Sequence, residues 1–243
     1  KECAATVKKV SMELGGLAPF IVFEDANIEA AIAGAIAAKY RNTGQTCVCA
    51  NRIYVHQDIY DEFCEGFTKE AEKLQTGQGF DPTADQGPLI DEAALVKVEE
   101  HVTDAKNHGG QVILGGRRHK LGGLFYEPTI IKNASDKMLL AHEETFGPVA
   151  PLFSFSTEEE VLARANNTPF GLASYFYTSD LAKIWRVSEQ LEYGMVGLNT
   201  GIVSTEMAPF GGVKESGMGR EGSKYGVEDY LETKYISIAG IDQ

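Results

Sequence analysis

Long hydrophobic runs and clustered basic charge are both missing from this 243-residue chain. No stretch approaches the about 18 consecutive apolar residues that a membrane-spanning helix requires. The longest basic run, Arg-Arg-His-Lys at residues 117–120, stands among glycines, and the formal net charge is −13. DNA, RNA and anionic membrane surfaces would repel such a charge. The composition therefore leaves a soluble acidic protein whose partners are small molecules or proteins, not nucleic acids or membranes.

Cysteine is scarce, and the familiar metal and nucleotide motifs do not occur. The four cysteines lack the paired spacing of a disulfide framework, which predicts a reducing, cytoplasmic compartment. The five histidines are scattered, and there is no H-E-x-x-H, C-x-x-C, P-loop or nucleophile-elbow pattern, so no metal site is predicted. Because the chain begins at Lys1 without a methionine or signal peptide, we expect a fragment of a longer protein.

The hydrophobic pattern alternates between the periods of strands and helices. Strands are predicted at 20–23, 52–56, 111–114, 126–132, 150–155, 172–178 and 195–199, and helices at 27–40, 58–76, 91–107, 157–166 and 179–193. Strands that alternate with helices through short loops pair in parallel. The expected fold class is therefore α/β, a layered parallel sheet. The tail adds a helix at about 224–231 and a strand at about 235–239 without an obvious partner.

A glycine-rich run at residues 217–222, Gly-Met-Gly-Arg-Glu-Gly, matches the G-x-G-x-x-G pattern of dinucleotide-binding folds. That mechanism requires a buried strand directly before the glycines and a βαβ unit around them. Here the preceding residues are loop-like and only 21 residues follow. We therefore interpret the run as a flexible glycine loop.

Two segments carry residues suited to chemistry. Cys47 lies in a polar, glycine-containing loop directly after a predicted helix, where an exposed thiol near positive charge can be held partly as the nucleophilic thiolate. Glu13 lies in an apolar, glycine-rich run, where desolvation would raise its pKa towards that of a general base. The residues alone also allow non-catalytic interpretations: Cys47 as a small buried residue, and Glu13 as a surface carboxylate at a strand end.

Five motifs in order resemble the aldehyde dehydrogenase superfamily. They are Met-Glu-Leu-Gly-Gly at 12–16, Gly-Gln-Thr-Cys at 44–47, Glu-Thr-Phe-Gly-Pro-Val at 144–149, Asn-Thr-Pro-Phe-Gly-Leu at 167–172 and Pro-Phe-Gly-Gly-Val-Lys-Glu-Ser-Gly at 209–217. The match covers roughly the C-terminal half of such an enzyme. It implies three parts: the end of the cofactor-binding domain at 1–15, the catalytic domain at 16–215, and a tail helix with an oligomerisation strand at 216–243.

The resemblance also implies roles for individual residues. Cys47 would be the nucleophile and Glu13 the general base, with the oxyanion held by the Cys47 N–H and by an asparagine of the missing half. The runs 41–52 and 201–205 are similar to those of succinate-semialdehyde dehydrogenases, in which residues at the positions of Arg41 and Ser204 bind the substrate's distal carboxylate. Thr205 is a nearby competitor. The residues implied to hold the nicotinamide riboside part of NAD or NADP are Leu14, Glu144 and Phe146.

The implied activity is oxidation of succinate semialdehyde, or a similar carboxylated aldehyde, by a homo-oligomer, either a dimer or a tetramer. Two alternatives stay open: a redox-independent cysteine hydrolase or acyl transferase that uses the same Cys47 and Glu13, and a non-catalytic fragment whose tail serves assembly. Arg41 has its own alternative, a helix C-terminal cation that complements the helix dipole. A further hypothesis is that Cys49 forms a reversible disulfide with Cys47.

Overall fold

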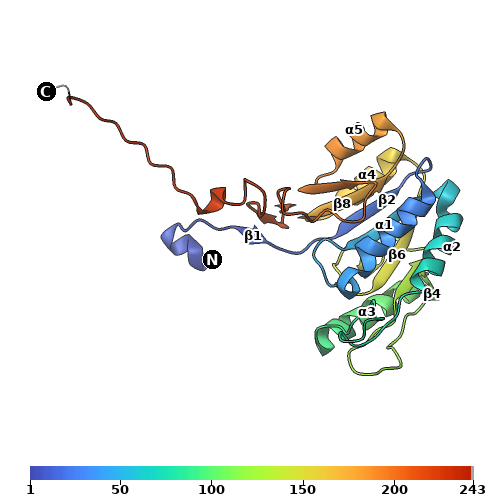
Figure 1. Ribbon diagram of the computed structural model, residues 1–243. Coiled ribbons are helices and arrows are strands. Elements are labelled where there is room, and N and C mark those ends of the chain that lie inside the picture. Colours follow the sequence, from blue (N-terminus) through green and yellow to red (C-terminus); the bar gives the residue numbers. More distant parts are fainter. Residues whose placement is uncertain (242–243) are drawn as a thin grey trace.

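A seven-stranded sheet forms the centre of the computed structural model, which describes residues 1–241 (Figure 1). The strand order is β4-β5-β6-β3-β2-β8-β9. Every neighbouring pair is parallel except β4 and β5, which are antiparallel. The predicted parallel α/β sheet is therefore confirmed, with one antiparallel edge strand. The strands are β2 (Ala18–Val22), β3 (Ala50–His56), β4 (Gln111–Leu114), β5 (Thr129–Lys132), β6 (Val149–Phe155), β8 (Ala173–Tyr177) and β9 (Met195–Leu198).

Helices cover both faces of this sheet because successive side chains of each buried strand point to opposite sides. Phe20 and Val22 of β2 pack in one core cluster with α1 (Ile28–Tyr40) and α2 (Tyr60–Ala71). Ile21 packs in a second cluster with α4 (Glu158–Asn166) and α5 (Leu181–Gln190). In a third cluster, α3 (Glu92–Asn107) packs against residues of β5 and β6. The result is the three-layer arrangement visible in Figure 1.

Helix starts follow the capping rules, with one correction. Asn27 and Thr157 accept hydrogen bonds from the third backbone N–H after them, as expected for N-caps. The predicted helix at 179–193 would be capped by Ser179, but the cap is Asp180, whose carboxylate accepts from the N–H groups of Ala182 and Lys183. The helix therefore starts one residue later, and Ser179 instead contacts Asp25.

Two small antiparallel pairs join distant parts of the chain next to the main sheet. β1 (Met12–Glu13) pairs with β11 (Gly217–Met218), and β7 (Phe170–Gly171) pairs with β10 (Val213–Lys214). The glycine run at 217–222 therefore begins in β11 and continues through bends and an isolated bridge between Glu221 and Phe210, with no βαβ unit around it in the described residues. Its interpretation as a glycine loop is confirmed.

The tail differs from the expected helix and strand. Between residues 224 and 231 there is only a short 3₁₀ turn, η5 (Glu228–Tyr230), so the predicted tail helix is wrong. Residues 235–239 form no strand within the described part of the chain, and Figure 1 shows the tail running away from the sheet. A short helix needs an apolar surface to pack on, whereas residues 229–232 make polar contacts, with Lys9 and the Arg220 N–H. A strand needs a partner backbone, and residues 235–239 have none among the described residues. None of the helices in residues 1–241 has the length and apolar character to cross a membrane.

Candidate active site

Three residues singled out in the sequence lie at the amino ends of neighbouring strands of the sheet. Glu13 precedes β2, Cys47 precedes β3 and Glu144 precedes β6. Because these three strands run parallel and are neighbours, their amino ends lie at the same edge. The sheet therefore brings three segments, far apart in the sequence, to one place.

The Cys47 loop is shaped by a sharp reversal after α1. The chain passes through the 3₁₀ turn η2 (Arg41–Gly44), in which Asn42 and Thr43 have φ angles of 50° and 58° in the left-handed region. That conformation stops the helix and turns the chain towards β3. Cys47 follows, half-buried, and its thiol lies close enough to the carboxylate of Glu13 for the two groups to shift each other's pKa. The nucleophile and general base implied by the resemblance are thus in direct contact.

The charges around Cys47 are opposite to those expected. Burial, and then the negative charge of Glu13, raise the pKa of the Cys47 thiol to about 12, with Glu144 adding to the effect. The expectation of an exposed thiol stabilised as thiolate by nearby positive charge is therefore wrong. Partial burial also raises the pKa of Glu13, in the direction expected for a general base. Glu13 is thus the carboxylate with the largest charge effect on the Cys47 thiol.

Two glycines allow the segments to approach this closely. A Cβ atom on Gly16 would lie 2.7 Å from the backbone oxygen of Cys47, and one on Gly15 would lie 2.8 Å from Oε2 of Glu144. The Gly16 N–H donates to Oε1 of Glu144 at 3.2 Å. The paired glycines after Glu13 therefore have a steric reason: larger residues would push the Cys47 loop and Glu144 away.

Glu144 and two apolar side chains form an open surface beside the thiol. Burial raises the pKa of Glu144, although the Gly16 N–H and Lys97 act in the other direction. The side chains of Leu14 and Phe146 are 49% and 38% exposed, which is unusual for large apolar residues next to a core. A carboxylate that accepts from sugar hydroxyls, flanked by exposed apolar groups, suits a ligand with a ribose and a flat ring.

Arg41 and Ser204 reach the same side of the core without touching each other in the described residues. Arg41 is exposed at the C-terminal end of α1, with its charge near the hydroxyl of Tyr175. That hydroxyl donates to the backbone oxygen of Val48 at 2.7 Å. Val203, the neighbour of Ser204, packs on the core cluster that includes Tyr175. Arg41 thus adjoins the Cys47 loop, and the residue before Ser204 packs against the same core cluster.

Cys49 points elsewhere. It is buried, and its thiol lies 3.7 Å from the backbone oxygen of Arg41. Cys47 and Cys49 are both free thiols in this structure. A disulfide between them would require Cys49 to leave its buried position.

Sequence reasoning missed the polar residues that support the site. Ser216 is fully buried, donates to the backbone oxygen of Gly15 at 2.7 Å and accepts from the N–H of Gly171 at 2.9 Å. Asn51, Lys97 and His101 contact the segment around Glu144. Ser216 and Asn51 lie inside runs already singled out, but nothing in their spacing distinguishes them from ordinary polar residues.

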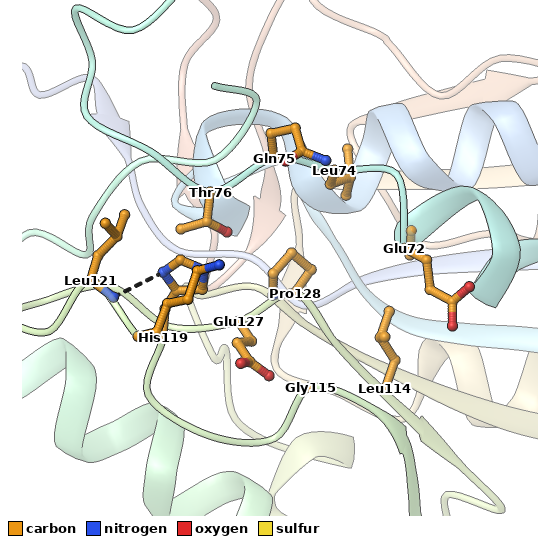
Figure 2. Close-up of a pocket in the computed structure, with 12 residues that line it drawn as sticks. Glu72, Leu74, Gln75, Thr76, Leu114, Gly115, His119, Leu121, Glu127 and Pro128 are labelled. Atoms are coloured by element: carbon orange, nitrogen blue, oxygen red, sulfur yellow. Dashed lines mark hydrogen bonds between the residues drawn. The ribbon is translucent and has the colours of Figure 1, made fainter. Parts of the chain in front are cut away.

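A separate pocket lies away from these residues. Figure 2 shows it between the end of α2 and β4, with His119, Glu127 and Glu72 among its lining residues. Its volume is about 320 Å³, and none of the predicted site residues lines it. In residues 1–241, no cluster of three or more His, Cys, Asp or Glu side chains could hold a metal ion.

Comparisons with known proteins agree with this geometry. The model of the aldehyde dehydrogenase family matches residues 1–236. The chain is 60% identical over 242 residues to 3-sulfolactaldehyde dehydrogenase of Pseudomonas putida, covering all of this chain and 50% of that protein. It is 57% identical over 238 residues to succinate-semialdehyde dehydrogenase [NADP(+)] GabD of Escherichia coli K12, covering 98% of this chain and 49% of that protein.

A solved structure extends the likeness to the fold. An aldehyde dehydrogenase from Brucella melitensis biovar abortus 2308 superposes with a TM-score of 0.95 at 59% identity, over 97% of this chain and 48% of the other. The chain thus spans about half the length of the curated relatives that it matches.

Proposed function

Because the chain belongs to the aldehyde dehydrogenase family, we propose that it supplies the catalytic half of an NAD- or NADP-dependent enzyme. That enzyme oxidises succinate semialdehyde, or a similar aldehyde with a distal acid group, to the acid. The observation that carries this proposal is the contact between the Cys47 thiol and the Glu13 carboxylate. Glu144 lies beside that pair, held by the Gly16 N–H.

The chemistry follows from the proton positions at this pair. The Cys47 sulfur adds to the aldehyde carbon while its proton passes to Glu13, which gives a tetrahedral thiohemiacetal. The Cys47 backbone N–H is the oxyanion donor that this chain contributes. Once the acyl group is held on Cys47 as a thioester, Glu13 releases its first proton to solvent and then, as a carboxylate, removes a proton from the water that hydrolyses the thioester. The raised pKa of Glu13 suits both proton transfers.

The open surface beside Cys47 fits the nicotinamide riboside part of the cofactor. Glu144 would accept hydrogen bonds from the ribose hydroxyls, and Phe146 and Leu14 would flank the ring, which matches their exposure. When bound, the nicotinamide supplies the hydride acceptor for the oxidation. The relative from E. coli is named as an NADP(+) enzyme.

The substrate class is carried by Arg41 and Ser204. A guanidinium can bind a carboxylate through two parallel hydrogen bonds, and a hydroxyl can add a third. The names of the two relatives fit an acidic substrate, since both 3-sulfolactaldehyde and succinate semialdehyde carry an acid group away from the aldehyde. Arg41 and Ser204, with Thr205 beside it, are therefore proposed to bind that distal group.

The division of the chain follows the same proposal. Residues 1–15 end the cofactor-binding domain, residues 16–215 form the catalytic domain, and residues 216–243 form a tail that joins copies into a homo-oligomer, either a dimer or a tetramer. The last two residues of that tail lie outside the described part of the chain. A cytoplasmic location is likewise proposed from the cysteine pattern alone.

The test uses this chain preceded by the N-terminal half of the E. coli relative, which we call the complete enzyme. Replacing Arg41 with alanine should lower kcat/KM for succinate semialdehyde about 10- to 1000-fold, because a charge-assisted contact contributes about 1.5–3 kcal/mol and its loss strands the carboxylate. For an uncharged aldehyde of similar length, kcat/KM should change by less than about threefold.

Steady-state kinetics on both aldehydes with saturating NADP provide the measurement. Ser204→Ala is the companion variant and should show the same selectivity with a smaller loss, because a neutral donor contributes less. An equal loss on both aldehydes in Arg41→Ala would mean that Arg41 supports the Cys47 loop and does not recognise the acid group.

A further inference from the structure

The segment that leads into β6 is held in a strained conformation. Phe146 has a φ angle of 52°, in the left-handed region that an aromatic residue with a Cβ atom seldom occupies. Such a conformation is energetically unfavourable, and it persists only where its surroundings determine it. Each of the three residues before Phe146 is in fact contacted by a side chain from another element.

Two of these contacts come from one face of α3. Lys97 and His101 are one helical turn apart, so their side chains project from the same face of the helix. Lys97 Nζ donates to the backbone oxygen of Glu144 at 2.6 Å. His101 is buried, with Nδ1 3.1 Å from Oγ1 of Thr145 and Nε2 3.5 Å from Oε2 of Glu143.

The protonation of His101 follows from these partners. Burial, and then the charge of Lys97, lower the pKa of His101, so the ring is neutral near pH 7. A neutral imidazole has one donor and one acceptor nitrogen. Because the Glu143 carboxylate only accepts, Nε2 carries the proton and Nδ1 accepts from the Thr145 hydroxyl. The Thr145 side chain is thereby fixed in direction.

The third contact comes from β3 and ties this segment to the nucleophile loop. The buried amide of Asn51 accepts from the N–H of Thr145 at 3.3 Å through Oδ1. Its Nδ2 donates to the backbone oxygen of Cys49 at 3.0 Å. One side chain therefore bridges Thr145, which stands between Glu144 and Phe146, and the loop that carries Cys47.

We propose that His101 and Asn51 are positioning residues that act through Thr145: they fix Glu144 and Phe146 in place relative to Cys47. His101 sets the direction of the Thr145 side chain from α3, and Asn51 fixes its backbone from β3. This inference rests on the proposed function, in which Glu144 and Phe146 bind the nicotinamide riboside. The two residues differ in what they position. His101 positions Glu144 and Phe146, the proposed cofactor-binding residues, whereas Asn51 positions both these residues and the loop that carries Cys47.

The matched pair Thr145→Val and Thr145→Ser tests the cofactor side in the complete enzyme. Valine keeps the shape of threonine but loses the hydroxyl, whereas serine keeps the hydroxyl. The valine variant should raise KM for NADP about three- to tenfold, the effect of losing one neutral hydrogen bond, and serine should stay within about twofold. Hydrolysis of p-nitrophenyl acetate without cofactor needs only Cys47 and Glu13, so neither substitution should change it by more than about twofold.

Asn51→Leu tests the bridge. It should raise KM for NADP like the valine variant, and it should also slow ester hydrolysis about three- to tenfold, because the Cys49 carbonyl loses its donor. Should Thr145→Val fail to fold, Lys97→Met gives the second measure of the cofactor side, with a raised KM for NADP and unchanged ester hydrolysis.

Several outcomes would overturn the inference. An unchanged KM for NADP in the Thr145→Val variant would overturn it. If that variant does not fold, an unchanged KM for NADP in Lys97→Met would overturn it. A parallel fall of oxidation and ester hydrolysis in that variant would do so as well, since it would show general loosening. Ester hydrolysis at the wild-type rate in Asn51→Leu would show that Asn51 does not position the Cys47 loop. A wild-type complete enzyme that oxidises no acidic aldehyde would instead refute the proposed function, and the two failures are therefore distinguishable.

Discussion

At the scale of single residues, the sequence identified which side chains matter better than what surrounds them. Cys47 and Glu13 were singled out by residue type and by family motifs, and the structure puts them in contact. The prediction of their electrostatic environment was wrong, because the charge next to Cys47 depends on which distant segments of the chain come together. Glu144 reaches Cys47 from nearly one hundred positions away in the chain, through the pairing of β3 with β6. No local pattern encodes that approach.

The Glu13–Cys47 contact predicts how the thiol reacts. Because the charge and hydrogen bond of Glu13 raise the Cys47 pKa, Glu13→Gln should lower it. Each unit of decrease raises the thiolate fraction at a given pH about tenfold. In a Cys3→Ser background, which removes the exposed cysteine, alkylation of Cys47 by iodoacetamide near pH 8 should be at least about threefold faster with glutamine at position 13.

Mass spectrometry of the modified peptide measures that rate, and Cys47→Ser verifies the assignment. In the parent protein the alkylation rate should keep rising with pH beyond about pH 9, because the thiol ionises only at high pH. A slower reaction in Glu13→Gln would show that Glu13 activates the thiol by taking its proton even without substrate.

At the scale of elements, the core helices and strands were predictable, and the failures have local causes. Buried alternation and caps defined β2, α1 and α4 to within a few residues. The α5 cap moved from Ser179 to Asp180 because Asp25, at the end of β2, takes Ser179 as a partner. The prediction of a tail helix failed because the segment has helical spacing but buries none of the residues of its one 3₁₀ turn, so no apolar packing stabilises a helix.

Asp25 gives the prediction at this scale. Burial raises its pKa, but hydrogen bonds from Thr178, Ser179 and Lys183 outweigh that effect and hold the pKa well below its usual range. Its carboxylate accepts from Oγ1 of Thr178 at 2.6 Å and from the N–H groups of Ser179 and Asp180 at 2.8 and 2.9 Å. The side chain thus joins the carboxyl end of β2 to the start of α5.

Replacing Asp25 with asparagine should lower the free energy of unfolding by about 1.5–3 kcal/mol near pH 7. A carboxyl whose pKa is depressed by folding stabilises above its unfolded pKa of about 3.9 and loses that contribution as the pH falls through the folded value. The difference between the two proteins should therefore shrink below about pH 4. Urea unfolding across this range is the measurement. Glu65→Gln, an exposed carboxylate on α2, is the control and should change little; a constant gap at every pH would argue against the charge.

At the scale of the whole molecule, the candidate site lies at the opposite end of the strands from the one that a general rule of α/β folds indicates. Ligands of open parallel sheets usually bind beyond the carboxyl ends of the strands. Here Glu13, Cys47 and Glu144 all precede their strands, so the site lies at the amino ends. At the carboxyl ends of β2 and β8, Asp25 instead forms hydrogen bonds and an ion pair with neighbouring polar groups. The order of motifs relative to strands, taken from the family resemblance, places the candidate site at the amino ends.

The tail is the other feature that makes sense only beyond the single chain. Ile236 and Ile238 are 69% and 68% exposed and alternate with the small residues Ser237 and Ala239, which is the period of a strand. Within residues 1–241 these residues pair with no strand, while β9 uses only one of its two edges, the one that faces β8. An apolar strand without a partner and a sheet edge without a neighbour are complementary between copies. This supports the proposal that the tail joins subunits by adding a strand to another copy's sheet.

Ile238→Pro separates that role from simple hydrophobic contact. Proline removes a backbone N–H and cannot donate to a ladder, so the variant should lose strand pairing between copies. Ile238→Val keeps the N–H and the β-branched shape, and it is the control. Light scattering on the complete enzyme should give the mass of a dimer or tetramer for the wild type and for valine, and a smaller species for proline. If the proline variant keeps the wild-type mass at the same concentration, the tail does not pair as a strand, and the subunits must meet through another surface.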